Sequence, residues 1–254
     1  MLFDALITYY LILTQPVPDM KVDLRPQFPP VFDQGKTRSC VSHSVASVIM
    51  YHRKVDTLDA KVPISGNLFP TVNFPSRLDL YHQSRDDKTK DDGATFKMTM
   101  DVLQGDTGLC DESDWPFNDR PKTILRPEPP PKCLKNRKPY TDFHPFHLPA
   151  NSRAVAYAIR RHRPVVVGLR LPLYFFKTAD IYKKGRLTEL PKPNRAESQI
   201  VSLHAMVAVG TSEENTIVLR NSWTKNWGDG GYVIVPSTFL DLYISDAWTL
   251  RPLL

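Results

Sequence analysis

Cysteine is scarce in this sequence, with three residues in a chain of 254. Three cysteines cannot form the disulfide framework of a small secreted domain, and the odd number leaves at least one thiol unpaired within the chain. Long apolar runs are also absent, because the longest one, residues 5–13, is far shorter than the roughly 20 residues that span a bilayer. We therefore expect no transmembrane helix, and we interpret each cysteine individually.

The chain also lacks a convincing signal peptide, an internal repeat and a low-complexity tract. Asp4 lies where a signal peptide carries Lys or Arg, and Thr14-Gln15-Pro16 is not a small-residue cleavage site. Apolar residues make up 41% and charged residues 24% of the chain, which is typical of globular proteins and excludes disordered and collagen-like classes. The sequence indicates no cellular compartment.

Basic side chains exceed acidic ones only slightly. The chain has 33 Lys and Arg residues against 27 Asp and Glu residues, for a net charge of +6. The basic residues gather at 132–138, 160–163 and 183–186, beside proline or glycine and without interleaved aromatic residues. Such clusters are typical of a solvated surface, so we expect no nucleic-acid partner.

Twenty-three prolines predict many loops and few long helices. In the first half, apolar residues at helical spacing follow Ser39, a candidate N-cap, so we expect a helix from Ser39 and two more at residues 75–83 and 94–103. In the second half we expect a short helix at 152–161. Apolar or alternating runs predict strands there at residues 164–171, 200–209, 216–219 and 231–235.

Helices first and strands second predict an α+β fold of two subdomains rather than an alternating βαβ sheet. The break falls in the proline-rich residues 106–149, which we interpret as a long ordered crossover or a linker. We expect a helical subdomain at residues 36–145, a β subdomain at residues 146–254 and the site in a cleft between them. We expect Cys110 and Cys133 to lie near each other, and to form a disulfide if the protein is exported or oxidised.

Cys40 is the best candidate for a nucleophile. It comes directly after the expected N-cap, where free backbone N–H groups and the helix dipole favour a thiolate. A buried, inert cysteine in an amphipathic helix is the alternative interpretation. Asp33-Gln34-Gly35 forms an expected turn just upstream, from which the Gln34 amide and the Cys40 N–H could face one developing oxyanion.

His204 is the best candidate for a base. It interrupts the apolar strand segment 201–207, where an unpaired imidazole is costly; a satisfied core histidine is the alternative interpretation. Asn221 follows at the end of the next strand, and its amide oxygen could orient the ring toward Cys40, as in a Cys-His-Asn triad. We expect His43 to point along its own helix. We expect surface positions for the histidines in polar settings: His52, His82 and His162.

Three blocks of the sequence resemble the papain-like cysteine peptidases. Residues 33–40 resemble the nucleophile block, residues 203–205 the block with the base, and residues 221–232 the third block. Their order and spacing are far more specific than any one block, and the similarity extends over residues 22–250, resembling a compact microbial and viral branch. The resemblance implies a papain-like fold with a helical part, a β-barrel-like part and an active-site cleft between them.

The resemblance also implies a role for each candidate. Cys40 attacks the scissile carbonyl as a thiolate, and His204 passes the proton to the leaving amine. Asn221 holds the imidazole, and Gln34 donates to the oxyanion. The implied substrates are polypeptides, and we expect a monomeric endopeptidase without a metal or another cofactor.

Three further residues are implied to bind substrate or to complete the site: Gly93, Trp223 and Ser39. Trp223 shields the hydrogen bond between the base and its amide partner from water. Gly93 pairs with the substrate backbone, although a glycine that opens a helix also has an ordinary structural explanation.

The sequence departs from the family pattern beside the nucleophile. Arg38 replaces a glycine that lies near bound substrate in the family, so we expect it to narrow the cleft or to attract acidic residues. The positions that resemble the main specificity pocket carry small side chains, Gly168, Ser202 and Ala205.

Three alternatives remain. A catalytically silent papain fold could serve as a binding module, and the same triad also supports thiol acyl transfer or removal of a protein modifier. The pairs Cys40-x-x-His43 and His144-x-x-His147 resemble zinc-ligand spacing, but 100 residues separate them and we interpret the pattern as coincidental.

Residues 1–21 are too few to fold as an inhibitory prodomain. Apolar residues at near-helical spacing between Leu2 and Leu13 form a broad face, which we expect to pack against the body of the protein. The segment is then a structural arm on the β subdomain or a short propeptide in the cleft. We favour the arm, because Pro16 and Pro18 stiffen the exit of the segment.

Overall fold

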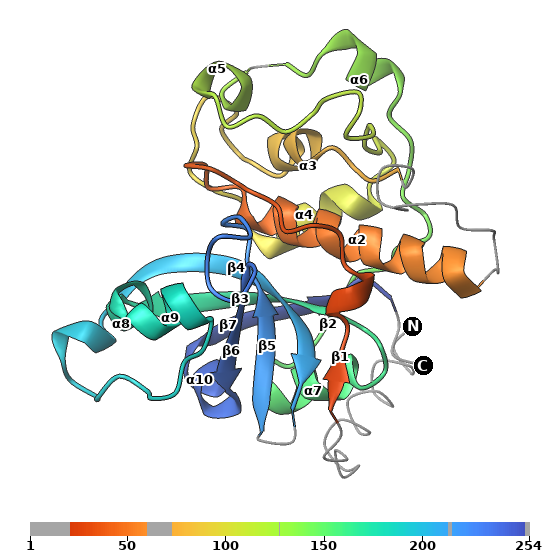
Figure 1. Cartoon of the computed structure of the whole chain (residues 1–254). Helices are drawn as coiled ribbons and strands as arrows, with labels where there is room; N and C mark the ends of the chain where they lie inside the picture. Colours follow the sequence, from red (N-terminus) through yellow and green to blue (C-terminus); the bar gives the residue numbers. More distant parts are fainter. Residues whose placement is uncertain (1–20, 60–72, 127, 213–214, 252–254) are drawn as a thin grey trace. The chain divides into compact units, whose positions relative to one another are not determined.

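The computed structural model of the chain describes residues 21–59, 73–126, 128–212 and 215–251 (Figure 1). The expected N-terminal arm therefore lies outside the described residues, except for its last residue. Contacts divide the chain into two units. The strand unit comprises Met1–Pro26, Pro145–Asn221 and Lys225–Leu254, and the helical unit comprises Gln27–His144 and Ser222–Thr224.

The strand unit is built on one antiparallel sheet (Figure 1). Its strands lie in the order β2 (Phe146–His147), β7 (Ile244–Thr249), β3 (Val165–Pro172), β4 (Ile200–Thr211), β5 (Thr216–Arg220) and β6 (Tyr232–Pro236), with β1 (Val22–Asp23) paired to β4. The four strands expected from the sequence are confirmed. The short β1 and β2 and the last strand, β7, were not expected.

β3 and β4 form the centre of this sheet. Almost every residue of β3 is buried, which suits its run of β-branched valines. β4 is buried from His204 onward, and its register sets His204 opposite Leu169 and Ala205 opposite Gly168. The register of the sheet therefore fixes the position of the His204 side chain.

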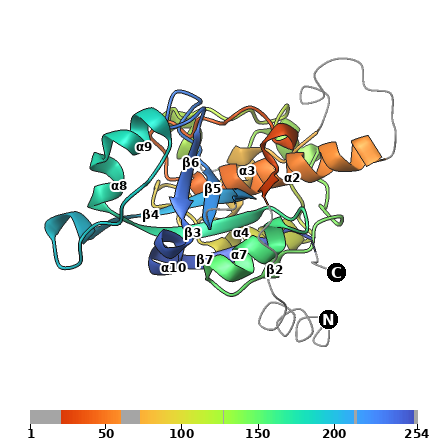
Figure 2. The same ribbon diagram turned by 60° about the horizontal axis from the view of Figure 1, so that its bottom comes forward.

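Helices of the strand unit cover the sheet and its edges. α7 (Ser152–Ile159) begins at the N-cap Asn151, whose side chain accepts a hydrogen bond of 2.8 Å from the Ala154 N–H. α7 and α10 (Ser237–Tyr243) contact each other and the sheet (Figure 2). The short segments α8 (Leu173–Lys177), α9 (Ala179–Lys184) and η2 (Ala196–Ser198) complete the unit.

The helical unit is organised around α2 (Cys40–Asp59), which contacts α3 (Arg77–Gln83) and α4 (Phe96–Gln104). Residues 41–52 are all buried, as expected for a central helix rather than a surface one. Serine side chains inside it are satisfied by the backbone: the Ser42 hydroxyl donates to the Ser39 carbonyl over 2.9 Å. The three helices expected in this half are confirmed, within two residues at their starts.

Up to His144, the described residues of the proline-rich stretch are an ordered part of the helical unit and not a linker. It forms two short helices that both begin at proline, α5 (Pro121–Ile124) and α6 (Pro131–Lys135). Cys110 and Cys133 form a disulfide with 5.1 Å between their Cα atoms, so the expected pairing is confirmed. The disulfide lies in a buried cluster with Leu78, Tyr81, Trp115 and Ile124.

A buried ion pair lies next to this disulfide. The fully buried Asp79 carboxylate accepts two hydrogen bonds from the Arg137 guanidinium and one of 3.0 Å from the Cys110 N–H. The basic cluster at 132–138 is therefore not entirely a solvated surface, because Arg137 neutralises a buried charge. In the part of the chain that the structure describes, no helix is long and apolar enough to cross a membrane.

The disulfide should contribute measurably to stability. Replacing Cys110 and Cys133 with Ser should lower the free energy of unfolding by about 3 kcal/mol, because an unfolded chain closed over 23 positions has less conformational entropy. Urea unfolding of both proteins measures the difference. Cys40→Ser is the control and should change the midpoint little; equal midpoints for all three proteins would contradict the prediction.

Candidate active site

Cys40 is the first residue of α2 and the cysteine that takes no part in the disulfide. Its side chain is partly exposed, whereas the next twelve residues are buried. The packed helix therefore holds the thiol at its N-terminal end, where the helix dipole favours negative charge.

Three hydrogen bonds fix the side chain and backbone of Gln34. Its N–H donates to the Ser222 carbonyl over 2.9 Å, and its Oε1 accepts from the Ser222 hydroxyl over 2.6 Å. Its Nε2 donates to the Thr37 carbonyl over 2.7 Å. Because Oε1 accepts from the Ser222 hydroxyl, the Gln34 amide has a single orientation. The Thr37 carbonyl accepts one of the two N–H groups on Nε2, and the second N–H takes no part in these contacts.

Within the helical unit, a short ladder of backbone contacts joins residues 32–34 to residues 222–224. Asp33 pairs with Trp223 in an antiparallel bridge, and the Thr224 N–H donates to the Phe32 carbonyl over 3.2 Å. Gly35 follows with a φ of 57°, and a Cβ there would lie 2.2 Å from an Asp119 oxygen, so only glycine fits the turn.

Ser39 is expected to bind substrate or to complete the site, and its side chain is buried. Ser39 is 1% exposed, and its hydroxyl lies 2.6 Å from the Thr37 hydroxyl and 3.1 Å from His43 Nδ1. These inward contacts shape the turn before Cys40. Only the backbone of Ser39 is left for a substrate.

His43 lies along its helix, as expected. Its Nδ1 lies 2.9 Å from the Ser39 carbonyl, and its ring packs edge-on against Phe117 with 4.4 Å between centroids. Burial, with the nearby Arg77 cation, lowers the pKa of His43 to about 3. His43 is thus a neutral core residue near pH 7 and a poor candidate for a base.

Arg38 and Gly93 lie side by side next to the nucleophile segment. The Asp91 carboxylate accepts from the Arg38 N–H over 3.1 Å and also from the Tyr81 hydroxyl. Gly93 has a φ of 96°, its N–H donates to the Tyr81 hydroxyl over 3.3 Å, and a Cβ there would lie 3.8 Å from the Arg38 Cβ. Burial, with the Asp91 hydrogen bond, raises the pKa of Tyr81, so its hydroxyl stays protonated.

The strand unit brings His204 and Asn221 together. His204 Nε2–H donates to Asn221 Oδ1 over 2.8 Å, which leaves the lone pair on Nδ1. His204 is 7% exposed, and burial lowers the pKa of His204 to about 4, against the opposing effect of the Asn221 hydrogen bond. The ring is therefore neutral near pH 7, which is the form that accepts a proton.

Two of the remaining histidines are not where the sequence suggested. His52 and His82 are buried, not exposed: His52 packs against Tyr51 and His82 against Trp115, with ring centroids 5.2 Å and 5.7 Å apart. His162 is exposed, as expected. Trp223 is half-buried, two residues after Asn221 in the chain.

The described residues contain one group with the geometry of metal ligands, Asp79 with Cys110 and Cys133. Both sulfur atoms belong to the disulfide, and the carboxylate is paired with Arg137, so this group does not fit a metal ion.

The sequence did not identify the groups that hold the candidates in place. Ser222 and Thr37 orient Gln34, and Asp91 holds the backbone of Arg38. Ser222 lies 188 positions from Gln34, so no local pattern joins them. The sequence feature that could have pointed to Ser222 is its position between Asn221 and Trp223 in the third block.

Comparison with known proteins assigns these features to a family. Residues 18–238 match the model of the papain family cysteine proteases. An uncharacterized peptidase C1-like protein of Acanthamoeba polyphaga mimivirus is 26% identical over 247 residues, which cover 91% of this chain and 72% of that protein. Cathepsin W of Felis catus is 25% identical over 156 residues, which cover 52% of this chain and 37% of that protein.

Two solved structures share the fold. Xylellain, a cysteine protease from Xylella fastidiosa, matches with a TM-score of 0.71 and 23% identity, over 95% of this chain and 88% of that one. Digestive procathepsin L 3 of the Tenebrio molitor larval midgut matches with a TM-score of 0.63 and 18% identity, over 95% of this chain and 73% of that one. The α+β fold expected from the sequence is thereby confirmed.

Buried neutral histidines should make the fold acid-sensitive. His43 has a folded pKa of about 3, below its ordinary value of 6.5, so its contribution to stability is complete above pH 6.5 and is lost as the pH falls toward 3. Between pH 7 and 4.5 this loss is about 3 kcal/mol. In His43→Gln the free energy of unfolding should fall less steeply over this interval, as measured by urea titrations at each pH. The exposed His162→Gln is the control; a slope unchanged in H43Q relative to H162Q would contradict the assignment.

Proposed function

Because the chain belongs to the papain family of cysteine proteases, we propose that it hydrolyses peptide bonds in polypeptides with Cys40 as nucleophile, His204 as base and Asn221 as the orienting residue. The observation that carries this proposal is the hydrogen bond from His204 Nε2–H to Asn221 Oδ1. It leaves Nδ1 as the basic nitrogen of a buried ring, which a Cys-His-Asn mechanism requires.

The first chemical step is acylation of Cys40. His204 Nδ1 takes the thiol proton, and the thiolate attacks the scissile carbonyl carbon. A C–S bond forms, and the carbonyl oxygen gains negative charge. The tetrahedral intermediate then expels the amine, which takes the proton from the imidazolium as the C–N bond breaks.

The acyl-enzyme is released by water. His204 takes a proton from the water molecule, the hydroxide attacks the thioester carbonyl, and the C–S bond breaks. The proton returns to the sulfur, so Cys40 is regenerated and the carboxylic acid leaves. A thiolate beside the ring would favour the imidazolium, opposing the burial that otherwise lowers the pKa of His204.

Gln34 and the Cys40 N–H are the proposed oxyanion donors. Ser222 and Thr37 fix the Gln34 amide before any substrate arrives, so its remaining N–H needs no reorganisation during the reaction. Preorganised donors of this kind contribute more than flexible ones, because the cost of orienting them is met in folding.

The proposed substrate contacts are those of an extended peptide. Gly93 is proposed to pair with its backbone through the Gly93 carbonyl, since the Gly93 N–H donates to the Tyr81 hydroxyl and no side chain covers the glycine. Trp223 is proposed to shield the hydrogen bond between His204 and Asn221 from water. Cleavage within chains rather than at their ends is part of the proposal, and peptides blocked at both termini test it.

Substitutions of the proposed catalytic residues should separate their roles. C40A and H204A should abolish turnover of a fluorogenic peptide library, because each removes a group that forms or breaks a bond. Gln34→Glu keeps the acceptor for Ser222 but removes the donor, so kcat should fall about 100- to 1000-fold.

The control is the exposed Gln199→Ala, which should retain full turnover. A peptidyl epoxide should label Cys40 in the wild type. Labelling of Cys40 without any turnover of the library would favour a silent binding module, and turnover by C40A would contradict the proposed nucleophile.

Arg38 should make the enzyme prefer acidic residues in the substrate. It is exposed, lies beside Gly93 and forms no salt bridge with the described residues. In R38Q the ratio of kcat/KM for peptides with Asp or Glu to that for neutral peptides should fall about threefold, the value of an exposed ion pair. Lys36→Gln removes the same charge from a nearby exposed position and is the control. A ratio that is equal in R38Q and wild type would contradict this role.

A further inference from the structure

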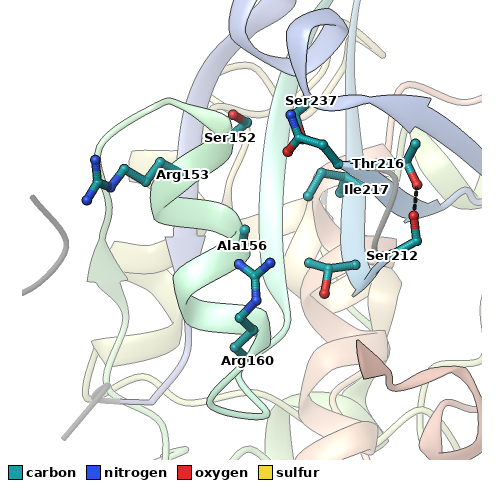
Figure 3. A pocket seen from close by; sticks show the side chains of 10 residues that line it. Ser152, Arg153, Ala156, Arg160, Ser212, Thr216, Ile217 and Ser237 are labelled. Atoms are coloured by element: carbon teal, nitrogen blue, oxygen red, sulfur yellow. Dashed lines mark hydrogen bonds between the residues drawn. The ribbon is translucent and has the colours of Figure 1, made fainter. Parts of the chain in front are cut away.

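A pocket in the strand unit contains none of the proposed peptidase residues (Figure 3). It lies between α7 and the start of α10, and two hydroxyls of its lining, those of Ser212 and Thr216, bond each other over 2.6 Å. Tyr81 in the helical unit differs from this lining, because its hydroxyl bonds a proposed substrate contact directly.

The ring of Tyr81 is fixed by its surroundings. It belongs to α3, is 1% exposed and packs in the buried cluster that contains Cys110 and Cys133. The Arg85 guanidinium lies over the ring, 4.6 Å from its centroid, and donates to the Lys90 carbonyl over 2.6 Å. A ring packed in this way has little freedom to move, so the position of its hydroxyl is set as well.

The Tyr81 hydroxyl joins two segments of the helical unit. It donates to the Asp91 carboxylate, whose oxygens accept the Arg38 N–H over 3.1 Å and 3.3 Å. It also accepts the Gly93 N–H over 3.3 Å. Arg38 comes two residues before Cys40. One hydroxyl therefore connects the segment before the proposed nucleophile to the glycine proposed to pair with substrate.

Asp91 sets the direction of the Tyr81 O–H. A hydroxyl can rotate to donate in several directions, but a carboxylate can only accept. The hydroxyl proton therefore points to Asp91, and the lone pairs of the oxygen are left for the Gly93 N–H. Burial, with the Asp91 hydrogen bond, raises the pKa of Tyr81, so this proton stays in place.

Gly93 is left with one backbone group for a ligand. Its N–H is engaged by the Tyr81 hydroxyl, whereas no residue in the described part of the chain donates to its carbonyl. Its φ is 96°, and glycine is the most permissive residue, so the direction of this carbonyl depends on the contacts that hold the glycine. A peptide that pairs with Gly93 must then supply a donor, which is a backbone N–H.

We propose that Tyr81 is a positioning residue for the peptidase reaction, and that with Asp91 it holds the Gly93 carbonyl ready to accept one backbone N–H of the substrate. The inference rests on the proposed function, because it requires a peptide bound beside Cys40. Tyr81 is too deeply buried to contact that peptide and acts through Gly93. It thereby selects which backbone group of the substrate is recognised, a donor rather than an acceptor.

Single N-methyl groups in peptide probes test this proposal. In a series of peptidyl epoxides, each backbone nitrogen of the peptide is methylated in turn, and mass spectrometry measures the second-order rate of Cys40 labelling. Methylation of the nitrogen that Gly93 recognises should slow labelling of the wild type about tenfold, because that nitrogen no longer donates. In Tyr81→Phe the loss at this position should be about threefold smaller, since the variant has already weakened the same contact.

Tyr140→Phe is the matched control. Tyr140 is 4% exposed, lies in the same unit and donates to Asp111 over 3.2 Å, so this change also removes a buried hydroxyl bonded to a carboxylate. In Y140F every methylated probe should lose the same factor as in the wild type.

A second pair of variants tests the same network without changing Tyr81. Asp91→Ala removes the acceptor that directs the Tyr81 hydroxyl, and it should reduce the loss at the same nitrogen as Y81F does. Asp92→Ala removes the neighbouring exposed carboxylate and should leave the losses unchanged.

The outcomes separate this proposal from the proposed function. Losses at every nitrogen that are equal in the wild type, Y81F and D91A would overturn the role of Tyr81, and so would equal reductions in Y81F and Y140F. Labelling without turnover of the peptide library would refute hydrolysis, while the losses would still report on Tyr81. Absence of Cys40 labelling in the wild type would overturn both.

Discussion

The hydrogen bonds between Gln34 and Ser222 are the constraint on which the candidate active site depends. They join positions 188 apart in the chain, and they use the backbone N–H and the side-chain oxygen of Gln34 together. Ser222 directly follows Asn221, the residue that orients His204. One dipeptide therefore serves both halves of the proposed chemistry: its first residue orients the base, and its second orients the oxyanion donor.

Burial keeps one histidine of each unit neutral. His43 and His204 are neutral because burial removes the water that would stabilise the imidazolium. The hydrogen bonds of the two rings engage different nitrogens. His43 is held by the Ser39 carbonyl at its Nδ1, whereas His204 is held at its Nε2 and retains Nδ1 as a basic nitrogen. The first arrangement stabilises a helix start, and the second is suited to proton transfer.

Much of the fold could be predicted from the sequence, in the elements where the side-chain pattern and the packing agree. The apolar spacing after Ser39 predicted α2, and burial extends beyond that apolar face to all of residues 41–52. β7 was missed because Asp246 interrupts its apolar pattern; that carboxylate is used locally, accepting from the Ala247 N–H and the Trp248 indole N–H. His52 was misplaced because its charged neighbours suggested a surface, whereas its ring packs against aromatic residues. Contacts between distant segments, such as those of Ser222, leave no local pattern.

The helical unit is not continuous in sequence, because Ser222–Thr224 belongs to it. During synthesis, a chain that has emerged only as far as His144 has all of α2 but lacks the segment that pairs with Phe32, Asp33 and Gln34. The oxyanion donor is then unsupported, and His204 and Asn221 do not yet exist. A nascent chain thus carries the Cys40 thiol until position 221 has been added without the groups proposed to make that thiol a nucleophile.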